Sequence, residues 1–278
     1  MRFGAHIRRA GVGIEGAVEG ARIRGADAAQ LFISNPRGWA PPRFDDDRAA
    51  GFRAAWSASG LGPLLAHAPY LVNIASPKPD MLAKSRLLAR ETLVACGSLG
   101  VDALVVHSGA GGTGDPAEAR ARAAETLRVA AEAGDGSTRI LVELMAGTSG
   151  AVASTLVEAA ALLAEPGLDD VGLCLDTCHL FAAGYGLDTE EGVAELFDEA
   201  ARLGLVGRIG AVHANDSMYE RGARRDRHEC IGDGLIGVDG FRALLARPEV
   251  ADLAFILETP SEADRHAADI ALLRSLAG

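Results

Sequence analysis

Residues 139–176 carry the repeating unit of this chain: an apolar strand-like run, RILVEL (139–144), a helical stretch over 151–164, and a second strand-like run, VGLCLD (171–176). Short apolar runs that alternate with helices of this length are typical of parallel β/α/β units. Parallel strands are covered by helices, so their side chains read as nearly continuous apolar residues. The stretch therefore predicts an α/β fold.

The same alternation extends over the whole chain. The predicted strands are Arg2–Ile7, Ala28–Ile33, Pro63–Ala68, Ala103–His107, Arg139–Leu144, Val171–Asp176, Arg208–His213 and Leu253–Glu258. The predicted helices lie near 13–24, 45–59, 78–98, 116–133, 151–164, 190–203, 238–246 and 262–276. Because α/β barrels of roughly 250 residues fold as one domain, we predict a single (β/α)8 TIM barrel over residues 1–278.

Three longer segments that follow strands are expected to be irregular: Asn35–Phe44, Leu180–Thr189 and Asn215–Gly237. In a barrel, the loops that follow strands form the functional face.

The composition predicts a cytoplasmic protein without a membrane partner. The sequence holds no run of about 18 apolar residues, and its first residues are too polar for a signal peptide. The four cysteines form no CxxC pair, so we expect them to be reduced and buried. A monomer is the default expectation.

The formal charge of −11 argues against broad, non-specific DNA binding, which depends on Lys and Arg. Bound divalent ions would offset part of this charge at one place. Arginines also gather locally, and each group is either a phosphate-binding patch or an ordinary solvated face. The groups are Arg8 and Arg9; Arg37 and Arg43; and Arg221, Arg224, Arg225 and Arg227.

Histidines and carboxylates gather where the predicted strands end. Four of the seven histidines lie there (His6, His67, His107, His213), as do three carboxylates (Glu143, Asp176, Glu258). Since parallel barrel strands all end on one rim, these side chains should converge. A carboxylate that ends an apolar strand is costly to desolvate alone, which predicts a bound cation.

Two loop segments enlarge this set, one with Asp176 and His179 and the other with Asp226 and His228. Imidazoles and carboxylates without a cysteine cluster favour zinc or manganese in a hydrolytic site. We leave His6 outside the ligand set, because a histidine of the first strand could equally line the pocket. His266 lies in a charged helical stretch and is expected to be exposed.

These residues resemble the endonuclease IV family of abasic-site repair enzymes. The similar stretches are Gly4-Ala5-His6, His67-Ala68-Pro69-Tyr70-Leu71-Val72-Asn73, Val105-Val106-His107-Ser108-Gly109, Val142-Glu143, Cys174-Leu175-Asp176-Thr177-Cys178-His179, His213-Ala214-Asn215-Asp216-Ser217, Asp226-Arg227-His228, Gly232-Asp233-Gly234-Leu235-Ile236-Gly237 and Ile256-Leu257-Glu258-Thr259. The resemblance implies three Zn²⁺ ions, with Mn²⁺ possible in part, and no organic cofactor. The implied ligand groups are His67, His107 and Glu143; Glu143, Asp176, His213 and Glu258; and His179, Asp226 and His228.

The resemblance also implies an activity and a partner. The partner is double-stranded DNA that contains an abasic site, and hydrolysis on its 5′ side leaves a 3′-hydroxyl and a 5′ deoxyribose phosphate. Glu143 and Glu258 are the implied catalytic residues, and Arg37, Tyr70 and Leu71 match side chains that enter the helix. Ordinary surface or loop packing is the alternative role for these three.

Two departures from the family pattern concern the fine shape of the pocket. Leu144-Met145 follows the glutamate where the family usually has Asn, and Ser108 stands where it usually has Pro. Two other functions stay open. A sugar isomerase or epimerase would need only Glu143, Asp176, His213 and Glu258, and a non-catalytic zinc- or nucleic-acid-binding protein would use the cluster structurally.

Overall fold

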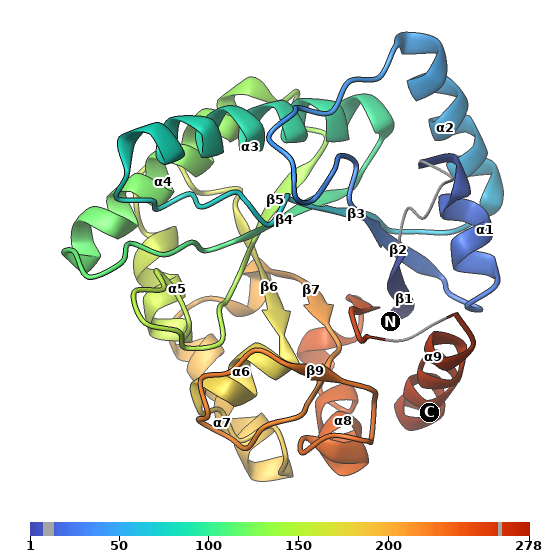
Figure 1. Ribbon diagram of the computed structural model, residues 1–278. Coiled ribbons are helices and arrows are strands. Elements are labelled where there is room, and N and C mark those ends of the chain that lie inside the picture. Colours follow the sequence, from blue (N-terminus) through green and yellow to red (C-terminus); the bar gives the residue numbers. More distant parts are fainter. Residues whose placement is uncertain (8–13, 261–262) are drawn as a thin grey trace.

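The computed structural model describes residues 1–7, 14–260 and 263–278, and its centre is a closed barrel of parallel strands surrounded by helices (Figure 1). Around the barrel the strands follow the order β1-β10-β7-β6-β5-β4-β3-β2. They are β1 (Arg2–Ile7), β2 (Ala28–Leu31), β3 (Leu64–His67), β4 (Ala103–His107), β5 (Arg139–Glu143), β6 (Gly172–Asp176), β7 (Ile209–His213) and β10 (Ala254–Leu257). The predicted TIM barrel is confirmed, and every predicted strand ends within two residues of the observed one.

The helices that cover the barrel follow the predicted ranges closely. They are α1 (Ala17–Arg22), α2 (Asp46–Ser59), α3 (Pro79–Leu99), α4 (Pro116–Ala133), α5 (Leu156–Leu163), α6 (Thr177–Ala183), α7 (Glu190–Arg202), α8 (Gly237–Leu245) and α9 (Ala263–Ala277), with short 3₁₀ turns at Ile14–Gly16, Val206–Arg208 and Pro248–Val250. The largest shift is at α5, because Thr155 and Glu158 form a capping box that starts this helix later than expected. None of the helices within the described residues is long and apolar enough to cross a bilayer.

Two observed elements were not predicted. α6 begins directly after β6 and extends into the segment Leu180–Thr189 that we expected to be irregular. The other segment, Asn215–Gly237, contains a small antiparallel ribbon of β8 (Asp216–Ser217) and β9 (His228–Glu229). Both elements follow strands of the barrel and carry side chains of the candidate site.

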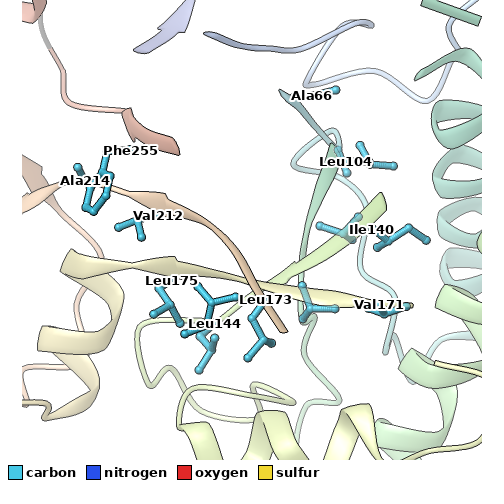
Figure 2. Packing of buried hydrophobic residues seen from close by; sticks show 14 of the residues in the cluster. Ala66, Leu104, Ile140, Leu144, Val171, Leu173, Leu175, Val212, Ala214 and Phe255 are labelled. Atoms are coloured by element: carbon cyan, nitrogen blue, oxygen red, sulfur yellow. The ribbon is translucent and has the colours of Figure 1, made fainter. Parts of the chain in front are cut away.

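Two separate apolar layers hold the barrel together. Outward-facing strand residues pack beneath the helices, and Figure 2 shows part of this layer with Leu104, Ile140, Leu173 and Val212. The inward-facing layer, called here the inner apolar layer, is smaller and is made of Ala28, Leu65, Ala103, Val105, Leu141, Cys174, Ala211, Ala254 and Ile256. The alternation of the two faces follows from the two-residue period of a strand.

Cys96, Cys174 and Cys178 are free thiols. Cys96, Cys174 and Cys178 are buried as expected, whereas Cys230 is only partly buried.

Candidate metal centre

Each barrel strand places one polar, inward-facing side chain within one residue of its carboxyl end. We call this set the polar ring. Its members, in strand order, are His6, Gln30, His67, His107, Glu143, Asp176, His213 and Glu258. The ring lies at the mouth of the barrel, above the inner apolar layer of the same strands. The period of two in β-strands explains its origin, because each ring residue follows an inward-facing residue two positions earlier.

Glu143 is the centre of the ring. Its side chain is 1% exposed, and Oε2 lies 3.0 Å from Nε2 of His67 and 3.3 Å from Nε2 of His107. Oε1, on the other side, lies 3.2 Å from Nδ1 of His213. One carboxylate thus faces imidazoles that reach it from three different strands.

A second group adjoins the first through the same carboxylate. Oε2 of Glu258 lies 3.2 Å and Oδ2 of Asp176 lies 3.9 Å from Nδ1 of His213. The potential ligand atoms of Glu143, Asp176, His213 and Glu258 all lie within 4.8 Å of one another. Asp176 also caps α6, because its carboxylate accepts a hydrogen bond from the backbone N–H of His179.

The third group comes from elements outside the barrel. His179 is carried by α6 and His228 by β9, while Asp226 precedes β9 in the loop. The carboxylate of Asp226 lies 3.4 Å from Nε2 of His179 and 3.2 Å from Nε2 of His228. All nine residues expected as ligands therefore lie together in three groups, of which two share Glu143.

The outer nitrogens of the buried imidazoles are held by oxygen acceptors. Nδ1 of His67 lies 2.7 Å from the carbonyl oxygen of Ala68, and Nδ1 of His179 lies 2.8 Å from that of Leu144. A carbonyl can only accept, so these nitrogens carry the proton and the opposite nitrogens are free to ligate.

The histidines and carboxylates of these groups shift one another's pKa values. Burial opposes ionisation of Glu143, but the imidazoles of His213 and His107 hold its pKa well below the ordinary value. Burial likewise opposes the charge of His228, but Asp176 and Asp226 raise its pKa to about 9. Without metal, protons on the imidazoles supply the positive charge that these carboxylates require.

The residues present fit divalent metal ions. Buried polar atoms nearly always make hydrogen bonds, yet Nε2 of His179 and Nε2 of His228, although they lie close to the carboxylate of Asp226, form no hydrogen bond of normal geometry within the described residues. Both atoms belong to the third group. Cys178 also lies close to Asp176 and His228. Burial raises the pKa of this thiol to about 12, and its Sγ lies 3.6 Å from the carbonyl oxygen of Arg227, to which it donates.

A cavity of about 790 Å³ opens above the polar ring. Arg37 and Tyr70 lie on its wall, and Tyr70 is 58% exposed. Leu71, the third residue expected to contact DNA, is half-buried beside them and does not line the cavity. The backbone N–H of Tyr70 donates to the carbonyl of Pro36, which ties the two rim loops together.

The arginine groups lie at different places. Arg8 and Arg9 fall outside the described residues. Arg37 and Arg43 are on the surface, as are Arg221, Arg224, Arg225 and Arg227 in the loop before β9. Of this last group, Arg227 lines the cavity, whereas Arg225 stacks over the ring of Tyr219 and Arg221 pairs with Asp188.

One expectation about a single residue was wrong, and one residue of the polar ring was not predicted. His266 was predicted to be exposed and is buried: its Nδ1 accepts a hydrogen bond from Arg24, which is 242 positions away in the sequence. Gln30 was not singled out at all, although it belongs to the polar ring. Its only sequence signal is a polar residue at an inward position of an apolar strand.

The departures at Ser108 and Leu144 do not shape the cavity. Both side chains are fully buried away from it, and Ser108 donates to the carbonyl of Ala153. Leu144 packs in the outward-facing layer.

Comparisons with known proteins agree with this geometry. Residues 18–276 match the family model of the xylose isomerase-like TIM barrel. A probable endonuclease 4 of Methanoculleus marisnigri is 41% identical over 280 residues, which cover 99% of this chain and 98% of the relative. The crystal structure of endonuclease IV from Thermus thermophilus is similar, with a TM-score of 0.88 and 34% identity over 99% of this chain and 98% of that one. A D-tagatose 3-epimerase-like protein has a TM-score of 0.75 at 19% identity over 99% and 97% of the two chains, which shows a common fold alone.

Proposed function

The chain belongs to the endonuclease IV family of TIM-barrel proteins, and from this membership we propose that it is a metal-dependent endonuclease of DNA repair. Its substrate is duplex DNA with an abasic site. Hydrolysis of the phosphodiester on the 5′ side of the lesion leaves a 3′-hydroxyl and a 5′ deoxyribose phosphate.

One observation carries the proposal: three His and carboxylate groups, two of them joined at Glu143, lie in one cavity at the mouth of the barrel. We assign one divalent ion to each group, with zinc as the expected metal and manganese as an alternative at part of the site. Metal ions in such a site provide Lewis acidity towards phosphate oxygens and activate water at neutral pH.

The protein side chains then have distinct tasks. Glu143 and Glu258 hold negative charge within the ring, where they orient an attacking water towards the phosphorus. The buried carbonyl contacts of His67 and His179 keep the imidazoles in one tautomer and one orientation. A site prepared in this way requires little reorganisation during the reaction.

Recognition of the lesion would come from the rim of the cavity. A nucleotide without a base is turned out of the duplex at a lower free-energy cost than a normal one, which favours the abasic site. Arg37 and Tyr70 on the cavity wall, together with Leu71 beside them, would enter the helix and fill the gap.

The rival sugar isomerase or epimerase explains only part of the site. That reaction needs one metal held by Glu143, Asp176, His213 and Glu258. It gives no task to the third group, in which the carboxylate of Asp226 lies 3.4 Å from Nε2 of His179 and 3.2 Å from Nε2 of His228.

The test is cleavage of a duplex with one abasic site by protein whose metal content has been measured. We expect chelation to abolish cleavage and added zinc or manganese to restore it. Cleavage that persists after verified removal of all metal would exclude the proposed mechanism.

The variants Asp226→Ala and His228→Ala distinguish the endonuclease from the isomerase. Each removes one ligand of the third group and leaves the groups at Glu143 intact, so the protein should retain roughly two metals. Single-turnover cleavage should fall at least about a hundredfold, on the order of 3 kcal/mol, with a smaller loss of DNA affinity. Wild-type protein that binds one metal, or variants that cleave at the parental rate, would favour the isomerase.

A further inference from the structure

Gln30 is the one member of the polar ring that is neither a histidine nor an acid. It lies on β2, is fully buried, and faces the barrel interior. Its amide contacts three other members of the ring. Nε2 lies 2.6 Å from Oε1 of Glu258 and 3.1 Å from Nδ1 of His6, and Oε1 lies 2.9 Å from Nε2 of His213.

These contacts fix the orientation of the amide. A carboxylate only accepts hydrogen bonds, so the group that faces Glu258 at 2.6 Å must be the NH₂. The flipped amide would place two oxygens against each other at this distance. The carbonyl oxygen of Gln30 is therefore directed at His213, and His213 must donate to it.

This orientation determines the tautomer of His213. Since Nε2 carries the proton that is donated to Gln30, Nδ1 presents its lone pair to the metal group. Nδ1 is the atom that lies 3.2 Å from both Glu143 and Glu258. We propose that Gln30 is a positioning residue of the metal centre. Its amide donates to the carboxylate of Glu258 and accepts from Nε2 of His213, and it thereby holds His213 in the tautomer whose Nδ1 can bind metal.

The other buried imidazoles show why this contact is informative. His67 and His179 use backbone carbonyls for the same purpose. His213 uses a side chain, so its orientation can be changed by substitution without altering the backbone. Loss of such an outer contact typically weakens metal binding about tenfold to a hundredfold.

The inference rests on the metal centre proposed above, and its test measures metal retention rather than cleavage. We compare Gln30→Met, which keeps the side-chain volume but removes all three contacts, with Leu31→Met as a matched control. Leu31 is the next residue of β2, is 1% exposed, and packs in the outward-facing layer. Metal-loaded proteins are challenged with a chelator, and metal release is followed.

We expect Gln30→Met to lower the affinity for one metal about tenfold to a hundredfold, and Leu31→Met to leave all affinities unchanged. The second readout is the ring N–H proton of His213 in histidine ¹⁵N-labelled protein. Wild-type protein should show this proton on Nε2, protected from exchange, and Gln30→Met should lose the protection. Gln30→Glu should keep it, because a carboxylate also accepts, but should still weaken metal binding through repulsion of Glu258.

The outcomes separate this inference from the proposed function. Wild-type protein that binds no divalent metal would overturn the metal centre itself. If wild-type protein binds metal and Gln30→Met retains both its metal and the protected His213 proton, Gln30 only fills space and the inference is wrong. If Gln30→Met does not fold, Gln30→Glu is the variant that tests the proposal. Loss of the protected Nε2 proton of His213 in Gln30→Glu would contradict it.

Discussion

Leu141 and Glu143 lie two residues apart on β5, face the same barrel interior, and are equally buried at 1% exposure. Leu141 belongs to the inner apolar layer, where it fills the space above two glycines: an added Cβ on Gly172 or Gly210 would come within 2.7 Å or 2.6 Å of its side chain. Glu143 is surrounded instead by imidazoles and carboxylates. A distance of two residues along one strand thus separates the inner apolar layer, which stabilises the barrel, from the polar ring, which contains the charged side chains.

The comparison shows how the barrel separates stability from function. Removing an apolar side chain from the inner layer loses buried area and packing, whereas removing a charge from the polar ring leaves the other charges uncompensated. Substitutions in the two layers should therefore be distinguishable by which property they change.

Glu143→Gln should reduce cleavage of abasic duplex at least about a thousandfold, on the order of 4 kcal/mol in the barrier. The change keeps the shape of the side chain but removes the charge that two metal groups share. Single-turnover kinetics and metal analysis provide the measurement. Glu165→Gln makes the same chemical change beside Arg120, away from the barrel mouth, and should leave both properties unaltered. Normal metal content in Glu143→Gln would contradict its bridging role.

Leu141→Ala should lower the free energy of unfolding by about 2–5 kcal/mol, with the metal content unchanged. The value should lie towards the upper end, because the neighbouring Gly172 and Gly210 have no side chains to fill the cavity. Denaturant unfolding of the metal-loaded protein measures the effect. Leu87→Ala, at a position 52% exposed, is the control and should change stability by less than about 0.5 kcal/mol. A drop in bound metal in Leu141→Ala would show that the two layers are not separable.

Metal uptake should release protons and strengthen with rising pH. In the metal-free protein the pKa of His228 is raised to about 9, so this imidazole is protonated at pH 7 and must lose its proton before it can ligate. Burial lowers the pKa of His179, but Asp176 and Asp226 raise it well above its ordinary value, so this imidazole must lose a proton as well. The apparent metal affinity of the third group should therefore rise by at least about tenfold per pH unit up to about pH 9. Calorimetry in two buffers of different ionisation enthalpy measures the released protons. Affinity independent of pH between about 6 and 9 would be incompatible with ligation by His228.

The smallest effect concerns the rim rather than the interior. Tyr70→Ala combined with Leu71→Ala should weaken binding to abasic duplex about thirtyfold, on the order of 2 kcal/mol, because the gap in the helix is no longer filled. Metal content and stability should stay near the parental values. Val157→Ala removes an apolar side chain of similar exposure from α5 and serves as control. Unchanged kinetics below saturation in the double variant would remove these residues from the DNA interface.

The sequence predicted the strands better than the segments that follow them. α6 was missed because no Gly or Pro separates it from β6, and Asp176 serves both as the last residue of the strand and as the helix cap. The burial of His266 could not be predicted, since its partner Arg24 lies just after α1, 242 residues away in the sequence. Gln30 escaped notice because an amide alone indicates no chemistry.

The sequence by itself determined which side chains face the barrel interior and which of them are polar, because both depend on a two-residue period that is local to each strand. It also placed the nine His and carboxylate residues at the ends of strands or in the loops beyond them. Only the tertiary structure decided which of them share a group and which ring nitrogen each histidine presents. Those properties depend on barrel closure, which brings Glu143 within 3.2 Å of His213, 70 residues away, and sets Gln30 beside both His213 and Glu258. Distances between strands follow from their tilt and register around the barrel, and no single strand carries that information.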